Sequence, residues 1–137
     1  MELLHSNIIG KGEKKLIILH GFLGMGDNWK THAKNLAEKG YCVHLIDQRN
    51  HGRSFWSDDF SYQFMVEDLK TYTDHHQIAS AILLGHSMGG KTAMNFALKY
   101  SQLVEKLIIA DISPKYYACL LYTSDAADEG LGVDLGG

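Results

Sequence analysis

The chain has 137 residues, of which 45% are hydrophobic, and a formal net charge of −3 at pH 7. This length suits one small domain, and an acidic balance without a run of Lys or Arg argues against a nucleic-acid or anionic-membrane partner. No apolar run approaches the roughly 20 residues that cross a bilayer, and no signal peptide is predicted. Two cysteines, Cys42 and Cys119, provide no disulfide framework, so we expect a reducing, cytoplasmic location.

The first third of the chain predicts two strands, a loop and a helix. Residues 2–9 predict a weak strand, and the continuously apolar residues 16–19 predict a strand covered on both faces. A loop with glycines at both ends, His-Gly-Phe-Leu-Gly, follows at 20–24. Residues 27–39 predict a helix with a polar N-cap, and Gly40 ends it.

The next segment repeats this alternation of strand, loop and helix. Residues 41–46 predict a third strand, and the polar residues 47–54 predict a loop. Ser61 can cap a second helix, whose apolar residues recur at helical spacing: Met65, Leu69 and Tyr72.

The centre of the chain is a Gly-x-Ser-x-Gly sequence around Ser87. An apolar strand predicted at 79–84 precedes it, and a helix predicted at 88–100 follows it. A serine on so sharp a strand-to-helix turn is strained and crowded, so the positions two before and two after it must lack side chains. The turn exposes the hydroxyl and directs the next backbone N–H, from Met88, toward a developing oxyanion. Residues 104–110 then predict a further buried strand.

Strands that alternate with helices over short connections predict the fold class: an α/β fold with a mostly parallel sheet and helices on both faces. Ligands of such sheets bind beyond the carboxyl ends of the strands. The polar motifs at 20–22 and 47–54, Ser87 and Asp111 all follow predicted strands. We therefore expect a site at this edge, with neither a metal nor a cofactor predicted.

From about residue 15 to 117 the sequence resembles the small serine esterases of the α/β-hydrolase fold. Within them it is similar to bacterial acyl-ester hydrolases related to the mitochondrial abhydrolase-domain proteins. The resemblance rests on four motifs: Leu19-His20-Gly21-Phe22-Leu23-Gly24, Asp47-x-Arg49-Asn50-His51-Gly52-x-Ser54, Gly85-His86-Ser87-Met88-Gly89-Gly90-Lys91 and Asp111-Ile112-Ser113-Pro114.

The resemblance implies a role for four residues. Ser87 would attack an acyl carbonyl, and the backbone N–H groups of Phe22 and Met88 would form the oxyanion hole. Asp111 would be the acid that orients the catalytic histidine, although many α/β-hydrolases place that acid one strand later. The implied function is cleavage of acyl esters through an acyl-enzyme, with a small-molecule acyl ester or thioester as substrate.

Structural alternatives remain open for these residues. Ser87 can be an ordinary N-cap, and Asp111 can cap the loop that leaves its strand. His20 is expected to bind loop backbone, and His51 to belong to a turn that shapes the site wall, since no ligand partners at suitable spacing favour a metal. Lys91 fits a surface position.

Two other function classes also remain open. One is a thioesterase, amidase or lyase that uses the same serine, which a substrate panel would separate. The other is a non-catalytic α/β-hydrolase-like binding module, which fluorophosphonate labelling would exclude.

All eight histidines of the sequence precede Ser87. Because α/β-hydrolases order their triad as serine, acid and histidine, the chain contains no candidate for the base that activates the serine. We therefore expect the 137-residue chain itself to be nearly inactive.

The C-terminal residues depart from the family pattern. Residues 119–129 resemble the translation of a transposase-type sequencing adapter, and 130–137 are rich in glycine. We expect a partial α/β-hydrolase domain at 1–118, a non-native and poorly packed tail at 119–137, and an exposed, aggregation-prone edge at strand 104–110.

Overall fold

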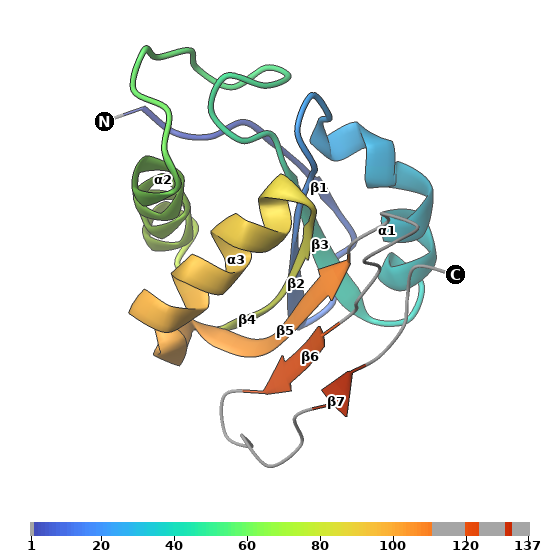
Figure 1. Ribbon diagram of the computed structural model, residues 1–137. Helices are drawn as coiled ribbons and strands as arrows, with labels where there is room; N and C mark the ends of the chain where they lie inside the picture. Colours follow the sequence, from blue (N-terminus) through green and yellow to red (C-terminus); the bar gives the residue numbers. More distant parts are fainter. Residues whose placement is uncertain (1, 111–119, 124–130, 133–137) are drawn as a thin grey trace.

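The structure, a computed structural model, describes residues 2–110, 120–123 and 131–132, which form one sheet with helices on both faces (Figure 1). The strand order is β1-β3-β2-β4-β5-β6-β7. The four central strands, β3, β2, β4 and β5, run parallel, while β1, β6 and β7 pair antiparallel with their neighbours. The strands span Ser6–Ile9 (β1), Lys14–Leu19 (β2), Tyr41–Ile46 (β3), Ala81–His86 (β4), Val104–Ala110 (β5), Leu120–Thr123 (β6) and Leu131–Gly132 (β7).

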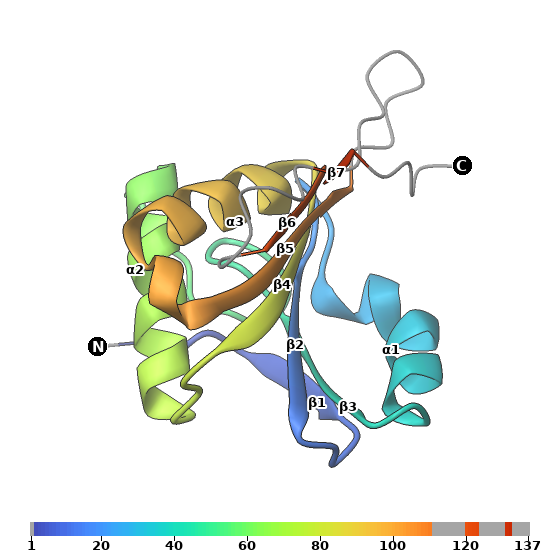
Figure 2. The same ribbon diagram turned by 90° about the horizontal axis from the view of Figure 1, so that it is seen from below.

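The helices divide between the two faces of the sheet (Figure 2). On one face lies α1 (Lys30–Ala37), preceded by the 3-10 turn η1 (Gly26–Trp29). On the other lie α2 (Tyr62–His75) and α3 (Met88–Lys99), which pack against each other, and the turn η2 (Ser101–Leu103) connects α3 to β5. This arrangement confirms the predicted fold class.

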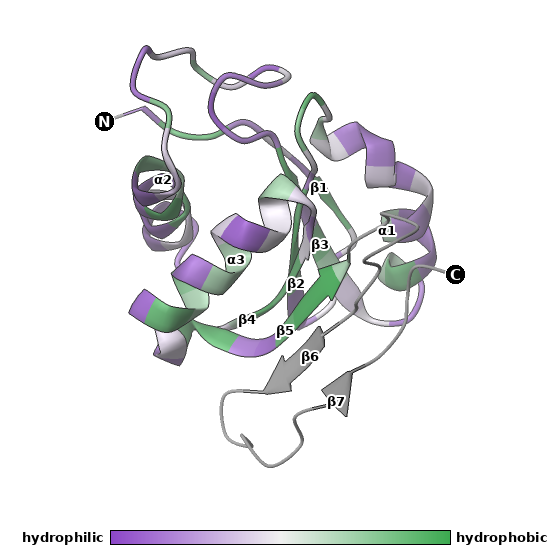
Figure 3. Cartoon of the chain, viewed as in Figure 1, coloured by the Kyte–Doolittle hydropathy of each residue, from purple (hydrophilic) through white to green (hydrophobic). Residues whose placement is uncertain are grey.

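Strand β2 shows why its sequence is continuously apolar. Its side chains alternate between two separate buried clusters, with Leu16 and Ile18 on the α1 face and Ile17 and Leu19 on the face of α2 and α3. All four are at most 4% exposed. A strand covered on both faces has no position for a polar side chain, and the central strands are accordingly hydrophobic in Figure 3.

The helix prediction around Ser61 is confirmed in detail. Ser61 precedes α2 and its hydroxyl accepts a hydrogen bond from the Phe64 N–H at 3.4 Å. Met65, Leu69 and Tyr72 are buried, as their spacing predicts. The first helix differs slightly from expectation, because residues 26–29 form a 3-10 turn before α1 begins.

The expected exposed edge at β5 is wrong for the described part of the chain. Strand β6 pairs with β5 in antiparallel register, with Ile108 opposite Leu121. This pairing supplies the backbone hydrogen bonds that an edge strand lacks, so it removes the physical basis for expecting aggregation there. Asp111 and most of the predicted tail lie outside the described residues.

Within that described portion, every helix is too short or too polar to span a lipid bilayer.

Candidate active site

Ser87 lies on the sharp turn between β4 and α3. Its backbone has φ 54° and ψ −115°, a conformation that non-glycine residues seldom adopt. The Ser87 N–H donates a hydrogen bond to the Ala110 carbonyl at 3.1 Å, which joins the turn to the end of β5. The side chain is exposed, and its hydroxyl has no hydrogen-bond partner among the described residues. Backbone strain therefore coincides with an exposed serine hydroxyl.

The flanking glycines are required for steric reasons. A Cβ added at Gly85 would lie 2.3 Å from the Gly89 carbonyl oxygen, and one added at Gly89 would lie 2.2 Å from the Leu19 carbonyl oxygen. Both contacts are with backbone, which cannot move aside as a flexible side chain can. The spacing of the Gly-x-Ser-x-Gly sequence thus follows from the close approach of the turn, the start of α3 and the end of β2.

Two backbone N–H groups near Ser87 are available as donors. Met88 is the first residue of α3, so its N–H has no acceptor within the helix. Phe22 lies in the 20–26 loop that follows β2, and its N–H has no hydrogen-bond acceptor among the described residues. Donors of this kind stabilise negative charge on a tetrahedral intermediate when they point at it.

Hydrogen bonds to the 47–54 loop hold the 20–26 loop in place. The first of them involve His20, at the start of the 20–26 loop. The His20 Nε2 accepts a hydrogen bond from the Gln48 N–H at 2.9 Å, and its Nδ1–H donates to the Gly21 carbonyl at 2.8 Å. The Gln48 amide donates in return to the His20 carbonyl at 2.9 Å. Burial lowers the pKa of His20, although its contact with the Gly21 carbonyl opposes this. His20 therefore binds loop backbone, as predicted, and it does so in its neutral form. Neither ring nitrogen is free to act as a base.

His51 makes a second link between the two loops. Its Nε2 accepts a hydrogen bond from the Leu23 N–H at 3.0 Å, and its Nδ1–H donates to the Arg49 carbonyl at 2.9 Å. Because Leu23 has a positive φ of 64°, this bond supports a backbone conformation that a branched residue rarely adopts. Both nitrogens are engaged, so His51 is no free base either.

Carboxylates complete the scaffold of the 47–54 loop. The buried Asp47 accepts hydrogen bonds from the Gly26 N–H at 2.7 Å and from the Arg53 N–H at 3.1 Å. Arg49 forms a bidentate pair with Asp68 of α2, at 2.6 and 2.9 Å, and this pairing raises the pKa of Arg49. The two loops and α2 are thus connected by polar contacts in which Ser87 takes no part.

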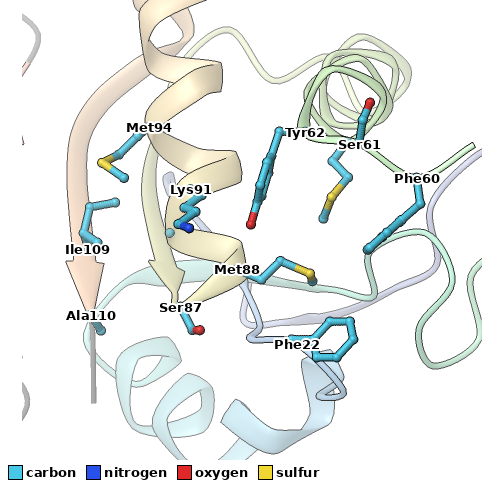
Figure 4. Close-up of a pocket in the computed structure, with 12 residues that line it drawn as sticks. Phe22, Phe60, Ser61, Tyr62, Ser87, Met88, Lys91, Met94, Ile109 and Ala110 are labelled. Atoms are coloured by element: carbon cyan, nitrogen blue, oxygen red, sulfur yellow. The ribbon is translucent and has the colours of Figure 1, made fainter. Parts of the chain in front are cut away.

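A cavity of about 670 Å³ opens beside Ser87. Figure 4 shows Phe22 from the 20–26 loop and Tyr62 from α2 lying on opposite sides of this space, with Met88 between them. Most of the lining is apolar, and Lys91, which is exposed as expected, is the charged side chain among the described lining residues. The lining residues are Phe22, Phe60, Ser61, Tyr62, Met65, Ser87, Met88, Gly90, Lys91, Met94, Ile109 and Ala110. Such a cavity can hold an apolar group of a substrate next to the serine.

The structure brings together Ser87, Phe22 and Met88, three of the four predicted site residues. Asp111 follows β5 directly and lies outside the described residues. Sequence reasoning missed Phe60 and Tyr62 as lining residues. A usable signal existed, because the helix capped by Ser61 follows the 47–54 loop and must begin near the carboxyl edge of the sheet.

Metal binding finds no support in the described part of the chain. It contains no group of three or more His, Cys, Asp or Glu side chains placed to hold a metal ion.

Comparison with known proteins places these features in a family. A family model described as the alpha/beta hydrolase fold matches residues 14–128. A Haemophilus influenzae protein named as an esterase/lipase is 46% identical over 102 residues, which are 74% of this chain and 35% of that protein. The sn-1-specific diacylglycerol lipase ABHD11 of Danio rerio is 44% identical over 107 residues, which are 77% of this chain and 34% of the lipase.

A solved structure, a marine microorganism esterase, superimposes with a TM-score of 0.79 at 47% identity, over 83% of this chain and 43% of the esterase. The chain thus spans about a third of the length of the curated relatives it matches. The chain belongs to the α/β-hydrolase fold family, because the family model matches it and because its sheet order and strained serine turn agree with that match.

Proposed function

We propose that the chain carries the nucleophile of a serine esterase that cleaves acyl esters through an acyl-enzyme. The observation that carries this proposal is the exposed Ser87 hydroxyl on a strained turn, beside an apolar cavity and two available N–H donors. Relatives named as esterases and lipases support the same reaction class.

The chemistry assigns one role to each residue. The Ser87 oxygen attacks the acyl carbon and its proton passes to a base, while the carbonyl electrons move onto oxygen. The N–H groups of Phe22 and Met88 stabilise that oxyanion. As it collapses, the bond to the leaving oxygen breaks and the protonated base gives its proton to that oxygen, which releases the alcohol. Water then releases the acid from the acyl-enzyme by the same steps. Asp111 would orient the base.

We further propose that this 137-residue chain hydrolyses esters at close to the uncatalysed rate. In this fold the base is a histidine that follows the acid, and no histidine follows Ser87 in the sequence. His20 and His51 lie in the two loops at this edge of the sheet, and hydrogen bonds already occupy both ring nitrogens of each. Loss of a triad member costs on the order of 10⁴ to 10⁶ in turnover.

The division of the chain is part of the same proposal. Residues 1–118 would be the hydrolase portion, and residues 119–137 a tail of non-native origin, because residues 119–129 resemble a translated sequencing adapter. Recovery of natural transcripts that encode residues 119–129 in frame would contradict the proposed non-native origin of the tail.

A thioesterase reaction is the second candidate, because the same serine, donors and apolar cavity serve a thioester as well as an oxygen ester. Turnover of matched oxygen esters, thioesters and amides distinguishes these reactions, and a preference for oxygen esters is expected.

The experiment compares the chain with a version extended beyond residue 118. The extension is the part of the marine esterase that lies C-terminal to the matched region. We expect the extended protein to hydrolyse p-nitrophenyl butyrate, with activity lost in Ser87→Ala, and the unextended chain to stay near background. Turnover by the unextended chain that Ser87→Ala abolishes would overturn the proposed inactivity. An inactive but folded extended protein would overturn the proposed function.

A further inference from the structure

We propose that His51 is a positioning residue for the esterase site: its Nε2 holds the 20–26 loop in the conformation that aims the Phe22 N–H at the oxyanion. This inference rests on the proposed function, since it gives a role to a residue that does not touch the reacting atoms. It starts from the Leu23 N–H, whose acceptor is the His51 Nε2 at 3.0 Å, 28 residues away in sequence.

The bond acts on the peptide next to the proposed donor. Leu23 follows Phe22 directly, and its positive φ of 64° sets the direction of the chain after Phe22. On the other side, the Gly24 N–H donates to the Gly21 carbonyl at 3.0 Å and closes the turn around Phe22. The Phe22 side chain is 62% exposed, so its own packing contributes little to its position. The Phe22 N–H lies in the same peptide as the Gly21 carbonyl, which also accepts from the His20 Nδ1–H at 2.8 Å. The turn, this His20 bond and the His51 bond together therefore determine where the Phe22 N–H points.

His51 is itself fixed strongly enough to serve as an anchor. It is 6% exposed, and its Nδ1–H donates to the Arg49 carbonyl at 2.9 Å. That bond requires the tautomer in which Nε2 is the acceptor, which is the form that Leu23 needs. The ring also contacts His20 at 5.0 Å and Phe22 at 5.7 Å between centroids.

The anchor continues into the helical layer. Arg49, whose carbonyl orients His51, is paired with Asp68 on α2 through two hydrogen bonds of 2.6 and 2.9 Å. Hydrogen bonds thus run from α2 through Arg49 and His51 to Leu23. A donor fixed in advance stabilises an oxyanion more than a donor that must be reoriented during the reaction.

Two substitutions at position 51 separate hydrogen bonding from packing. His51→Phe keeps an aromatic ring of similar shape and removes both ring nitrogens. His51→Gln keeps an acceptor near the position of Nε2 and removes the ring. His75→Phe, at an exposed position near the end of α2, is the matched control.

The first measurement is hydrogen exchange of the Leu23 amide, followed by NMR in the 137-residue chain. We expect exchange on the order of 10-fold faster in His51→Phe, and within about 3-fold of the parent in His51→Gln and His75→Phe. Unchanged Leu23 exchange in a folded His51→Phe variant would overturn the inference, whatever the activity of the site.

The second measurement is the affinity for phenylboronic acid, whose tetrahedral adduct with a serine oxygen mimics the oxyanion. In the protein extended beyond residue 118, we expect an adduct that Ser87→Ala abolishes, on the order of 10-fold weaker binding in His51→Phe, and substantial recovery in His51→Gln. Faster Leu23 exchange with unchanged boronate affinity would overturn the positioning role. Absence of an adduct in the folded extended protein would instead contradict the proposed function, and the exchange result would still decide whether His51 holds the loop.

Discussion

Two loops at the carboxyl edge of the sheet reach their conformations by different means. The turn at Ser87 is determined locally, because Gly85 and Gly89 allow backbone to approach backbone where any Cβ would collide. The conformation of the 20–26 loop is determined from a distance, by hydrogen bonds with the side chains of Asp47, Gln48 and His51. The position of the proposed nucleophile, Ser87, thus depends on missing side chains, and that of the proposed oxyanion donor Phe22 depends on side chains contributed by another loop.

The difference has a consequence for how each loop fails. A clash at the Ser87 turn disturbs β2, β4 and α3 together, because these elements meet there. Loss of one hydrogen bond to the 20–26 loop leaves the sheet intact and frees a short segment of backbone. We therefore expect substitutions at the turn to affect folding, and substitutions in the 47–54 loop to affect local order first.

The largest effect is expected for Gly85→Ala. The added Cβ would lie 2.3 Å from the Gly89 carbonyl oxygen, and we expect the free energy of unfolding to fall by about 3 kcal/mol or more. Gly40→Ala is the control, because Gly40 has a positive φ of 96° but open space around it, so the cost there is about 1 kcal/mol. Urea unfolding measures both, and equal losses would contradict the steric account.

A smaller effect is expected for Asp47→Asn in the 47–54 loop, which holds the 20–26 loop. The new amide keeps one acceptor oxygen and sets an NH₂ group against a backbone N–H, which leaves a buried donor unsatisfied. We expect a loss of about 2 kcal/mol, with faster amide exchange at Gly26 and little change at Ser87. The exposed Asp58→Asn is the control. Equal acceleration at Gly26 and Ser87 would show that the loops are not independent.

Acid is expected to destabilise the chain through its buried histidines. Burial lowers the pKa of His44, whose Nδ1 lies 2.6 Å from the Tyr72 hydroxyl, from 6.5 to about 4, and burial also lowers the pKa of His20. Because the unfolded chain binds these protons first, stability is complete above about pH 6.5 and falls as the pH drops toward 4.

Urea unfolding at pH 7 and pH 4.5 measures this dependence. We expect the titration of His44 to lower the free energy of unfolding by about 2 kcal/mol between these two pH values, a figure reduced to allow for partial access of water. His44→Gln should lose that part of the pH dependence, while His75→Gln should retain it. Protonation of His20 also removes the acceptor for the Gln48 N–H, so amide exchange in the 20–26 loop should accelerate before exchange at Ser87. A pH-independent free energy of unfolding would contradict this account.

The smallest effect is expected for Ser61→Ala, which tests the N-terminal cap of α2. The Ser61 hydroxyl caps α2 through a hydrogen bond of 3.4 Å, and its removal should cost about 0.5–1 kcal/mol. Ser80→Ala, at an exposed position before β4, should cost less. Loss of order in the 20–26 loop in Ser61→Ala would mean that α2 contributes more to that loop than the Arg49–Asp68 pair.

The same distinction explains what the sequence could predict. Local features were predictable: the two glycines around Ser87, the Ser61 cap, and the apolar run of β2 that requires cover on both faces. Contacts between distant residues were not, because no spacing rule pairs His51 with Leu23 or His44 with Tyr72. The antiparallel pairing of β6 with β5 was missed for the same reason, since pairing depends on the whole sheet.

Site prediction followed this division. Ser87 and Met88 belong to one local motif, and Phe22 was found by resemblance to a family loop. The structure adds what neither source could supply, namely the residues that hold that loop. It also adds the contribution of Tyr62 to the cavity wall, for which the Ser61 cap was an unused signal. The assignment of Asp111 remains a prediction, as it lies outside the described residues.

Labelling with a fluorophosphonate followed by peptide mass spectrometry tests the central claim most directly, because the reagent marks an activated serine and identifies it by position. In the protein extended beyond residue 118, we expect a single phosphonylated residue, Ser87, and no label in Ser87→Ala. The unextended chain should remain unlabelled over the same time. Labelling of a different residue, or an unlabelled Ser87 in a folded extended protein, would contradict the assignment of Ser87 as the nucleophile.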